Sequence, residues 1–153
     1  MLGAIQFVKT AGRALGAVFN KDKGKEELEK EIEGYGLDKS GMDIVVNADG
    51  TVSLKGKSVS QEMKEKIILA VGNVEGVGTV NDEADVEGDA TASQFHTVVS
   101  GDTLWAVSKK YYGKGGRYQE IFEANRPMLK HPDKIYVGQV LRIPADSKDG
   151  ASA

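Results

Sequence analysis

The chain has 153 residues, enough for one average domain or two small ones, and its 40% apolar and 28% charged residues are typical of globular proteins. It contains no cysteine, which excludes disulfide bridges and thiolate metal sites. The net charge of −3 is unevenly spread, because residues 24–91 carry seven lysines against sixteen acidic residues. A segment this acidic is a poor binder of nucleic acid, since phosphate neutralisation needs clustered Lys and Arg.

The first 23 residues are predicted to form a separate amphipathic segment. Lys9 and Arg13 interrupt what would be the apolar core of an export signal, and no run approaches the ~18 apolar residues of a membrane span. We therefore expect a cytoplasmic protein without stable membrane insertion. The apolar residues of this segment recur at helical spacing: Leu2, Ile5, Val8, Leu15 and Phe19. A docked helix is expected rather than a weak membrane-surface helix, because the polar face carries few basic residues.

Residues 24–87 show the pattern of five elements in the order α-β-β-α-β. These are a helix over 25–35, strands over 43–47 and 51–55 joined by Asp49-Gly50, a helix capped by Ser58 or Ser60, and a strand over 79–86. A glycine-rich loop, GNVEGVG, joins the second helix to the last strand. This order, with the turn NADGTVSLKG and the run AVGNVEGVGTV, resembles a BON domain.

The residues from Gln94 to Pro144 predict a second small domain. A short alternating strand turns at SGDT, two helical patterns follow, and a second strand ends at the proline. Asp102 or Thr103 is expected to cap the first helix, and Asn125 to end the second in a left-handed conformation. This βααβ order resembles a LysM module, a domain that many proteins use to bind N-acetylglucosamine polymers.

We therefore predict an α+β protein of two small domains preceded by an amphipathic segment. The boundaries are 1–23 for that segment, 24–87 for the BON-like domain, 88–93 for a linker, 94–145 for the LysM-like domain and 146–153 for a disordered tail. Together with the N-terminal FVKTAG, the two modules resemble the bacterial cytoplasmic potassium-binding proteins that join a BON domain to a LysM domain.

An enzyme is not expected from this sequence. Its two histidines, His96 and His131, lie apart and lack metal-ligand spacing, and no G-x-S-x-G motif is present. The GNVEGVG loop has no G-K-[ST] ending and follows a helix, whereas a phosphate-binding loop precedes one.

The position of the loop, Gly72–Gly78, favours a cation instead. The last four carbonyls of a helix lack partners within the helix, and the helix dipole makes that end negative. K⁺ is well satisfied by neutral carbonyl oxygens, whereas Ca²⁺ and Mg²⁺ recruit carboxylates, of which the loop offers only Glu75. From the loop alone, however, a helix C-cap and tight turn that bind nothing are the expected outcome.

The family resemblance implies a specific ligand set. In this family K⁺ is held by main-chain oxygens where the N-terminal segment meets the loop, and the matching positions are Val8, Ala11, Gly72, Val74 and Val77. The implied protein is a monomeric cytoplasmic potassium sensor or buffer, with the LysM-like domain stabilising the bound state.

The alternative hypothesis is a periplasmic, cell-envelope protein that binds peptidoglycan or N-acetylglucosamine oligomers. The LysM resemblance implies a shallow groove between two turns, lined by Gly101, Asp102, Thr103, Leu104, Pro132, Ile135 and Tyr136. Trp105 could add a stacking face, although an ordinary half-buried aromatic residue is the expected outcome.

Overall fold

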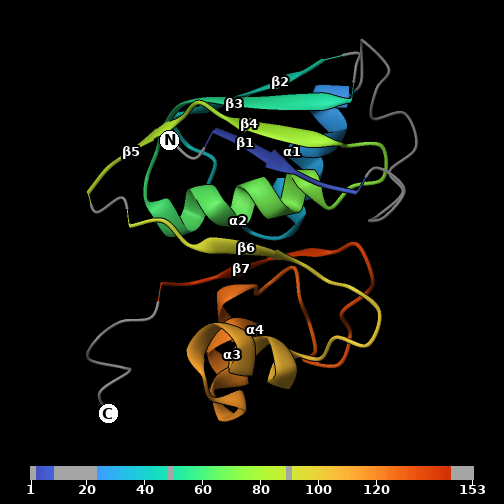
Figure 1. Cartoon of the computed structure of the whole chain (residues 1–153). Coiled ribbons are helices and arrows are strands. Elements are labelled where there is room, and N and C mark those ends of the chain that lie inside the picture. Colours follow the sequence, from blue (N-terminus) through green and yellow to red (C-terminus); the bar gives the residue numbers. More distant parts are fainter. Residues whose placement is uncertain (1–2, 9–23, 48–49, 89–90, 146–153) are drawn as a thin grey trace.

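The computed structural model describes residues 3–8, 24–47, 50–88 and 91–145. Within these ranges the chain has the predicted α+β class, with a larger sheet and two helices in the first module and a two-stranded sheet with two helices in the second. The modules are stacked, so that helix α2 lies between the two sheets (Figure 1). The predicted tail, 146–153, and much of the N-terminal segment lie outside the described residues.

The sheet of the first module has the strand order β1-β4-β3-β2, with β5 paired to the end of β3. Its strands are β1 (Gly3–Gln6), β2 (Met42–Val46), β3 (Thr51–Ser58), β4 (Thr79–Asp82) and β5 (Asp85–Val86). The β2–β3 and β1–β4 pairs are antiparallel, whereas β3 pairs parallel with both β4 and β5. Parallel pairing of β3 with β4 needs a crossover, and helix α2 (Gln61–Gly72) provides it.

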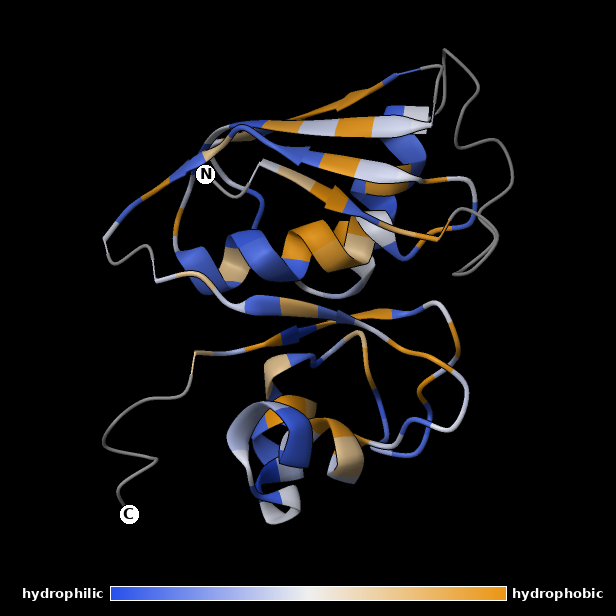
Figure 2. Ribbon diagram, in the orientation of Figure 1, coloured by the Kyte–Doolittle hydropathy of each residue, from blue (hydrophilic) through white to orange (hydrophobic). Residues whose placement is uncertain are grey.

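Helix α2 is predominantly buried because it is covered on two sides. Nine of its twelve residues are buried, whereas α1 (Gly24–Gly34) buries only one stripe against the sheet. The Ser60 hydroxyl caps α2 by accepting a hydrogen bond of 3.0 Å from the Met63 amide. Of the two predicted caps, Ser58 and Ser60, the second is therefore confirmed. The C-terminal half of α2 is apolar and its N-terminal half polar (Figure 2).

The N-terminal segment begins as a strand, which corrects the prediction of a helix there. Residues 3–6 form β1 on the edge of β4, in a register that pairs Ile5 with Val80. Ile5 and Phe7 are buried while Val8 is 40% exposed, which is the two-residue period of a strand. The predicted helical spacing is therefore wrong for this part, because the free edge of β4 supplies partners for its backbone. Residues 9–23 lie outside the described ranges.

The second module contains β6 (Gln94–Thr97), α3 (Leu104–Tyr112), a single 3₁₀ turn (Gly115–Arg117), α4 (Tyr118–Ala124) and β7 (Val140–Ile143). Strands β6 and β7 are antiparallel. The Thr103 hydroxyl caps α3 by accepting a bond of 3.1 Å from the Ala106 amide.

The left-handed conformation predicted for Asn125 is wrong. Its φ is −107°, and its side chain instead bonds both backbone groups of Arg142 in β7. An asparagine after a helix therefore serves here to join α4 to the sheet.

Two apolar clusters fill the molecule, and they are not fully separate. Leu104, Ile121 and Leu141 belong to the cluster of the second module. Val140 of β7, however, belongs to the cluster of the first, where it meets the apolar end of α2. Among the described helices, none combines the length and the apolar character needed to cross a membrane.

Candidate functional site

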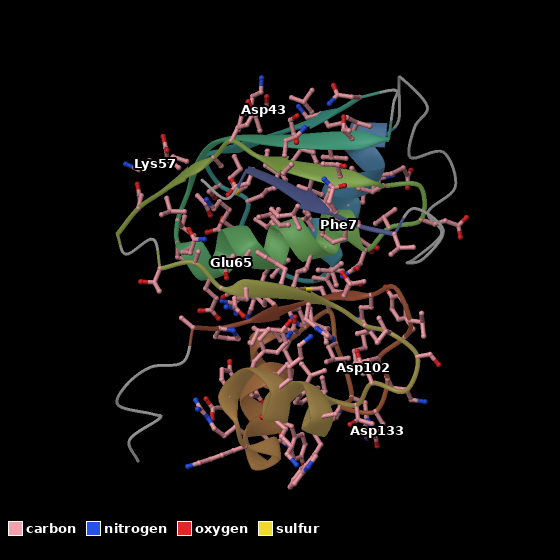
Figure 3. The ribbon with its side chains drawn as sticks, in the orientation of Figure 1. Phe7, Asp43, Lys57, Glu65, Asp102 and Asp133 are labelled. Atoms are coloured by element: carbon pink, nitrogen blue, oxygen red, sulfur yellow. The ribbon has the colours of Figure 1, made fainter. Side chains whose placement is uncertain are left out.

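The residue that follows the N-terminal strand β1 contacts the glycine-rich loop. The amide of Phe7, the residue after β1, donates a hydrogen bond of 2.9 Å to the carbonyl of Gly78. Its ring lies against Gly72, where any Cβ atom would overlap the ring. Figure 3 shows Phe7 beside the C-terminal end of α2. Gly72 is therefore a place where two distant segments meet and only glycine fits.

The loop after α2 has a defined turn geometry. The Asn73 amide closes the helix with a bond of 3.0 Å to the Leu69 carbonyl. A turn follows in which the Val77 amide donates to the Val74 carbonyl at 3.1 Å, with Gly76 at a φ of +101°. The loop is thus fixed at both ends and in the middle, and its peptide groups have set directions.

The loop is also shielded from water, which strengthens the electrostatic interactions of its carbonyl groups. Val74 and Val77 are fully buried, and Gly72 and Gly78 are buried too, whereas Glu75 points into solvent. Carbonyl dipoles at the negative end of α2 act in a low dielectric there. This arrangement fits a cation that prefers neutral oxygens. Among the described residues, no group of three His, Cys, Asp or Glu side chains is placed to hold a metal.

The structure brings four of the five predicted ion ligands to one region. Val8 directly follows Phe7, and Gly72, Val74 and Val77 form the loop on which Phe7 lies. Ala11 lies outside the described residues. The assignment of individual carbonyls remains a prediction, while the meeting of the two segments is observed.

Asn73 was not predicted, although it lies inside the loop. Its side chain donates to the Val140 carbonyl at 2.8 Å and accepts from the Val140 amide at 2.9 Å. The residue is 6% exposed. The sequence offers no signal for this contact, because its partner is 67 residues away.

A second buried contact joins the modules near the other end of α2. Glu65, fully buried, accepts from Arg142 of β7 at 2.8 Å and from the Ser93 amide at 2.8 Å. Burial alone raises the pKa of Glu65, but hydrogen bonds from Ser93 and Gln61 and the Arg142 charge outweigh it, so the pKa lies below its ordinary value. Figure 3 shows Glu65 between α2 and β6.

Comparison with known proteins agrees with this two-module architecture. The BON domain family model matches residues 20–88 and the LysM domain model matches residues 96–144. A protein of Escherichia coli O6:H1 named potassium binding protein Kbp is 48% identical over 150 residues, covering 95% of this chain and all of its own length. The chain belongs to the family of Kbp.

The resemblance stated from the sequence is thus confirmed for this Kbp-family chain. A shorter match, 33% identical over 63 residues, is to the uncharacterized protein YqbP of Bacillus subtilis, covering 35% of this chain and 29% of that one. The Gly72–Gly78 loop, which contains three of the five predicted ion ligands of this Kbp-family chain, lies within the BON match.

The LysM match contains a groove of about 570 Å³. Thr103, Leu104 and Pro132 of the predicted set line it, together with the ring of Trp105. Trp105 is 57% exposed, which corrects the expectation of a half-buried residue. The structure describes all seven predicted groove residues, but four of them do not line this groove: Gly101, Asp102, Ile135 and Tyr136. Tyr136 instead lines another hollow, together with Tyr35 of the BON domain.

Asp102 has a structural partner that the sequence did not predict. Its carboxylate contacts the His96 ring at 2.8 Å and accepts from the Val99 amide at 3.0 Å. The hydrogen bond from the Val99 amide has the larger effect on the pKa of Asp102, and the bond with His96 adds to it. Together they hold this pKa below its ordinary value. Tyr111 contacts the other nitrogen of His96 at 3.0 Å. The cluster ties the turn before α3 to strand β6.

Proposed function

We propose that this protein binds K⁺ through main-chain oxygens of the N-terminal segment and the Gly72–Gly78 loop. The observation that carries the proposal is the junction of Phe7 with Gly72 and Gly78, which joins both predicted halves of the site. The named activity of the Kbp relative supports the same ion. Carbonyl oxygen ligands that are shielded from water suit a weakly hydrated monovalent cation.

The proposed role is that of a potassium sensor or buffer acting as a cytoplasmic monomer without catalytic activity. BON and LysM domains are binding modules, and the same chain-wide match to Kbp supports a binding role. Docking of the LysM domain against α2 through Val140 would stabilise the bound state, because that strand borders the loop.

The proposal is tested by thermal melting of the full chain in K⁺ and in Na⁺ at equal ionic strength. K⁺ is expected to raise the melting temperature, because a ligand that binds only the folded state stabilises it by mass action. A chain lacking residues 1–12 should lose the K⁺ response, since it loses the N-terminal half of the site. Equal responses of the full chain to the two salts would rule out selective K⁺ binding.

A second function is favoured by the exposed ring in the LysM groove. Trp105 lies 6.0 Å from Tyr118, ring centre to ring centre, and both line the groove. Aromatic faces of this kind pack against the apolar faces of sugars. We propose binding of N-acetylglucosamine oligomers there as the alternative function. Retention on purified sacculi that is lost in Trp105→Ala supports it, and no retention of the full chain eliminates it.

A further inference from the structure

Two asparagine side chains cover the free edge of strand β7. Asn73 donates to the Val140 carbonyl and accepts from its amide, at 2.8 and 2.9 Å. Asn125 does the same for Arg142, at 2.9 and 2.8 Å. Both amides are buried, with 6% and 2% of their surface exposed. The carboxamides therefore take the place of a neighbouring strand at alternate residues of β7.

The two contacts differ in what they connect. Asn125 follows α4, so its contact stays within the LysM domain. Asn73 follows α2, so its contact crosses from the BON domain to the LysM domain. It also lies between Gly72 and Val74, two of the predicted ion ligands.

Asn73 is held at its backbone as well as at its side chain. Its amide bonds the Leu69 carbonyl at 3.0 Å, which points that N–H back along α2. Because the peptide group is planar and trans, the Gly72 carbonyl must point the opposite way, beyond the end of the helix. The next peptide leads to Val74, whose carbonyl is held by Val77 at 3.1 Å. The backbone of Asn73 therefore sets the direction of the Gly72 carbonyl, and its side-chain bonds to Val140 fix where that backbone lies against β7.

We propose that Asn73 is a positioning residue of the ion site, through which strand β7 of the LysM domain pre-orients the loop carbonyls for K⁺. The inference rests on the proposed function. A pre-oriented cage binds more tightly because less order is lost on binding. Asn73 itself does not touch the ion. It acts by fixing the peptide groups on either side of it.

The test compares Asn73→Ala with Asn125→Ala by calorimetric titration of the full chain with KCl. Each variant removes the same pair of bonds to β7, and Asn125→Ala also removes a bond of 2.7 Å to the Ile121 carbonyl. Asn125→Ala should therefore lower the ion-free melting temperature at least as much. Asn73→Ala should weaken K⁺ affinity by about tenfold, a typical coupling between linked sites. Asn125→Ala should weaken it far less, and only Asn73→Ala should reduce the preference for K⁺ over Na⁺.

The outcomes separate this inference from the function on which it rests. If the unmodified chain takes up no K⁺, the proposed function fails. If the unmodified chain binds K⁺ and the two variants lose affinity equally, or neither loses any, the function stands and the positioning role of Asn73 is overturned.

Amide hydrogen exchange on the unmodified chain gives an answer even if Asn73→Ala does not fold. Coupling is reciprocal, so K⁺ should tighten the contact that orients its site. The Val140 amide should therefore gain more protection on adding KCl than the Arg142 amide, which is held by Asn125 on the same strand. Equal changes at the two amides contradict the inference.

Discussion

Gly72 is the residue at which the candidate site is most sensitive to a single added carbon. It is buried at the end of α2, and the ring of Phe7 occupies the space that a Cβ would fill. Phe7 itself is 8% exposed and belongs to the core cluster of the BON domain. A side chain at Gly72 would have to displace that ring, and with it the chain that leads to Val8.

Gly72→Ala should destabilise the protein and abolish the K⁺ response. Forcing an extra carbon into a packed core costs about 1–3 kcal/mol of unfolding free energy, and the displaced ring would carry the N-terminal segment off the loop. Urea unfolding with and without KCl measures both effects. The control is Gly34→Ala at the end of α1, where a Cβ would meet nothing within 4 Å. A stable Gly72→Ala variant that keeps the K⁺ response would show that the contact between Phe7 and Gly72 is not needed to assemble the site.

Helix α2 is joined by buried ion pairs to both of its neighbours, the sheet of the BON domain and the LysM domain. Lys64 contacts Asp82 of the sheet at 2.9 Å and donates to the Ala84 carbonyl at 3.0 Å. The next residue, Glu65, contacts Arg142 of the LysM domain. Buried charges of this kind are costly when one partner is removed, because the other is left without compensation.

Glu65→Gln should lower the unfolding free energy at neutral pH by about 3 kcal/mol, because it leaves the Arg142 charge buried without its partner. The folded-state pKa of Glu65 is lowered, so its stabilisation is fully present above the ordinary glutamate pKa of about 4.3 and is lost as pH falls through the folded value. The difference between variant and parent should therefore shrink in acid, as urea unfolding at several pH values would show.

The matched control is Glu62→Gln on the same helix. Glu62 pairs with Lys66 at 3.3 Å, but its side chain is 63% exposed, so the expected change is about 0.5 kcal/mol or less. Similar losses in the two variants, or a Glu65→Gln loss that is independent of pH, would contradict the structural role assigned to Glu65.

Most elements could be predicted from the sequence because their signals are local. The periodicity of α1 and the cap at Ser60 depend on neighbouring residues only. Strand β1 could not be predicted from the sequence, because Ile5 and Val8 also fit a helical spacing. Only the free edge of β4 decides between helix and strand. The prediction that Val8 and the loop belong to one site came from the family resemblance rather than from the residues themselves.

At the scale of the whole molecule, the two modules form one continuous packing arrangement rather than two domains on a tether. Val140 lies in the core cluster of the BON domain, and Asn73 and Glu65 bond strand β7 near the two ends of α2. Residues 24–91 carry seven lysines against sixteen acidic residues, whereas residues 92–153 carry nine Lys and Arg against six acidic residues, a pattern that indicates only a long-range attraction screened by salt. The observed contacts are short and buried, and partners so distant in sequence could not be paired from composition.

This packing predicts that the ion and the domain interface respond together. K⁺ at the loop should tighten the contact with β7, so the chain should become more compact when K⁺ binds. Small-angle scattering in KCl and in NaCl at equal ionic strength measures the change in radius of gyration. A smaller radius in KCl is expected, and the difference should disappear in Gly72→Ala.

The central claim is that the junction of the N-terminal strand with the Gly72–Gly78 loop binds K⁺ selectively. Calorimetric titration of the full chain with KCl, against NaCl in the same buffer, tests it most directly. Saturable heat with a stoichiometry of about one K⁺ per chain, and no comparable heat with Na⁺, is the expected result for a single cage of neutral carbonyls. The absence of saturable K⁺ heat, or equal binding of Na⁺, would contradict it.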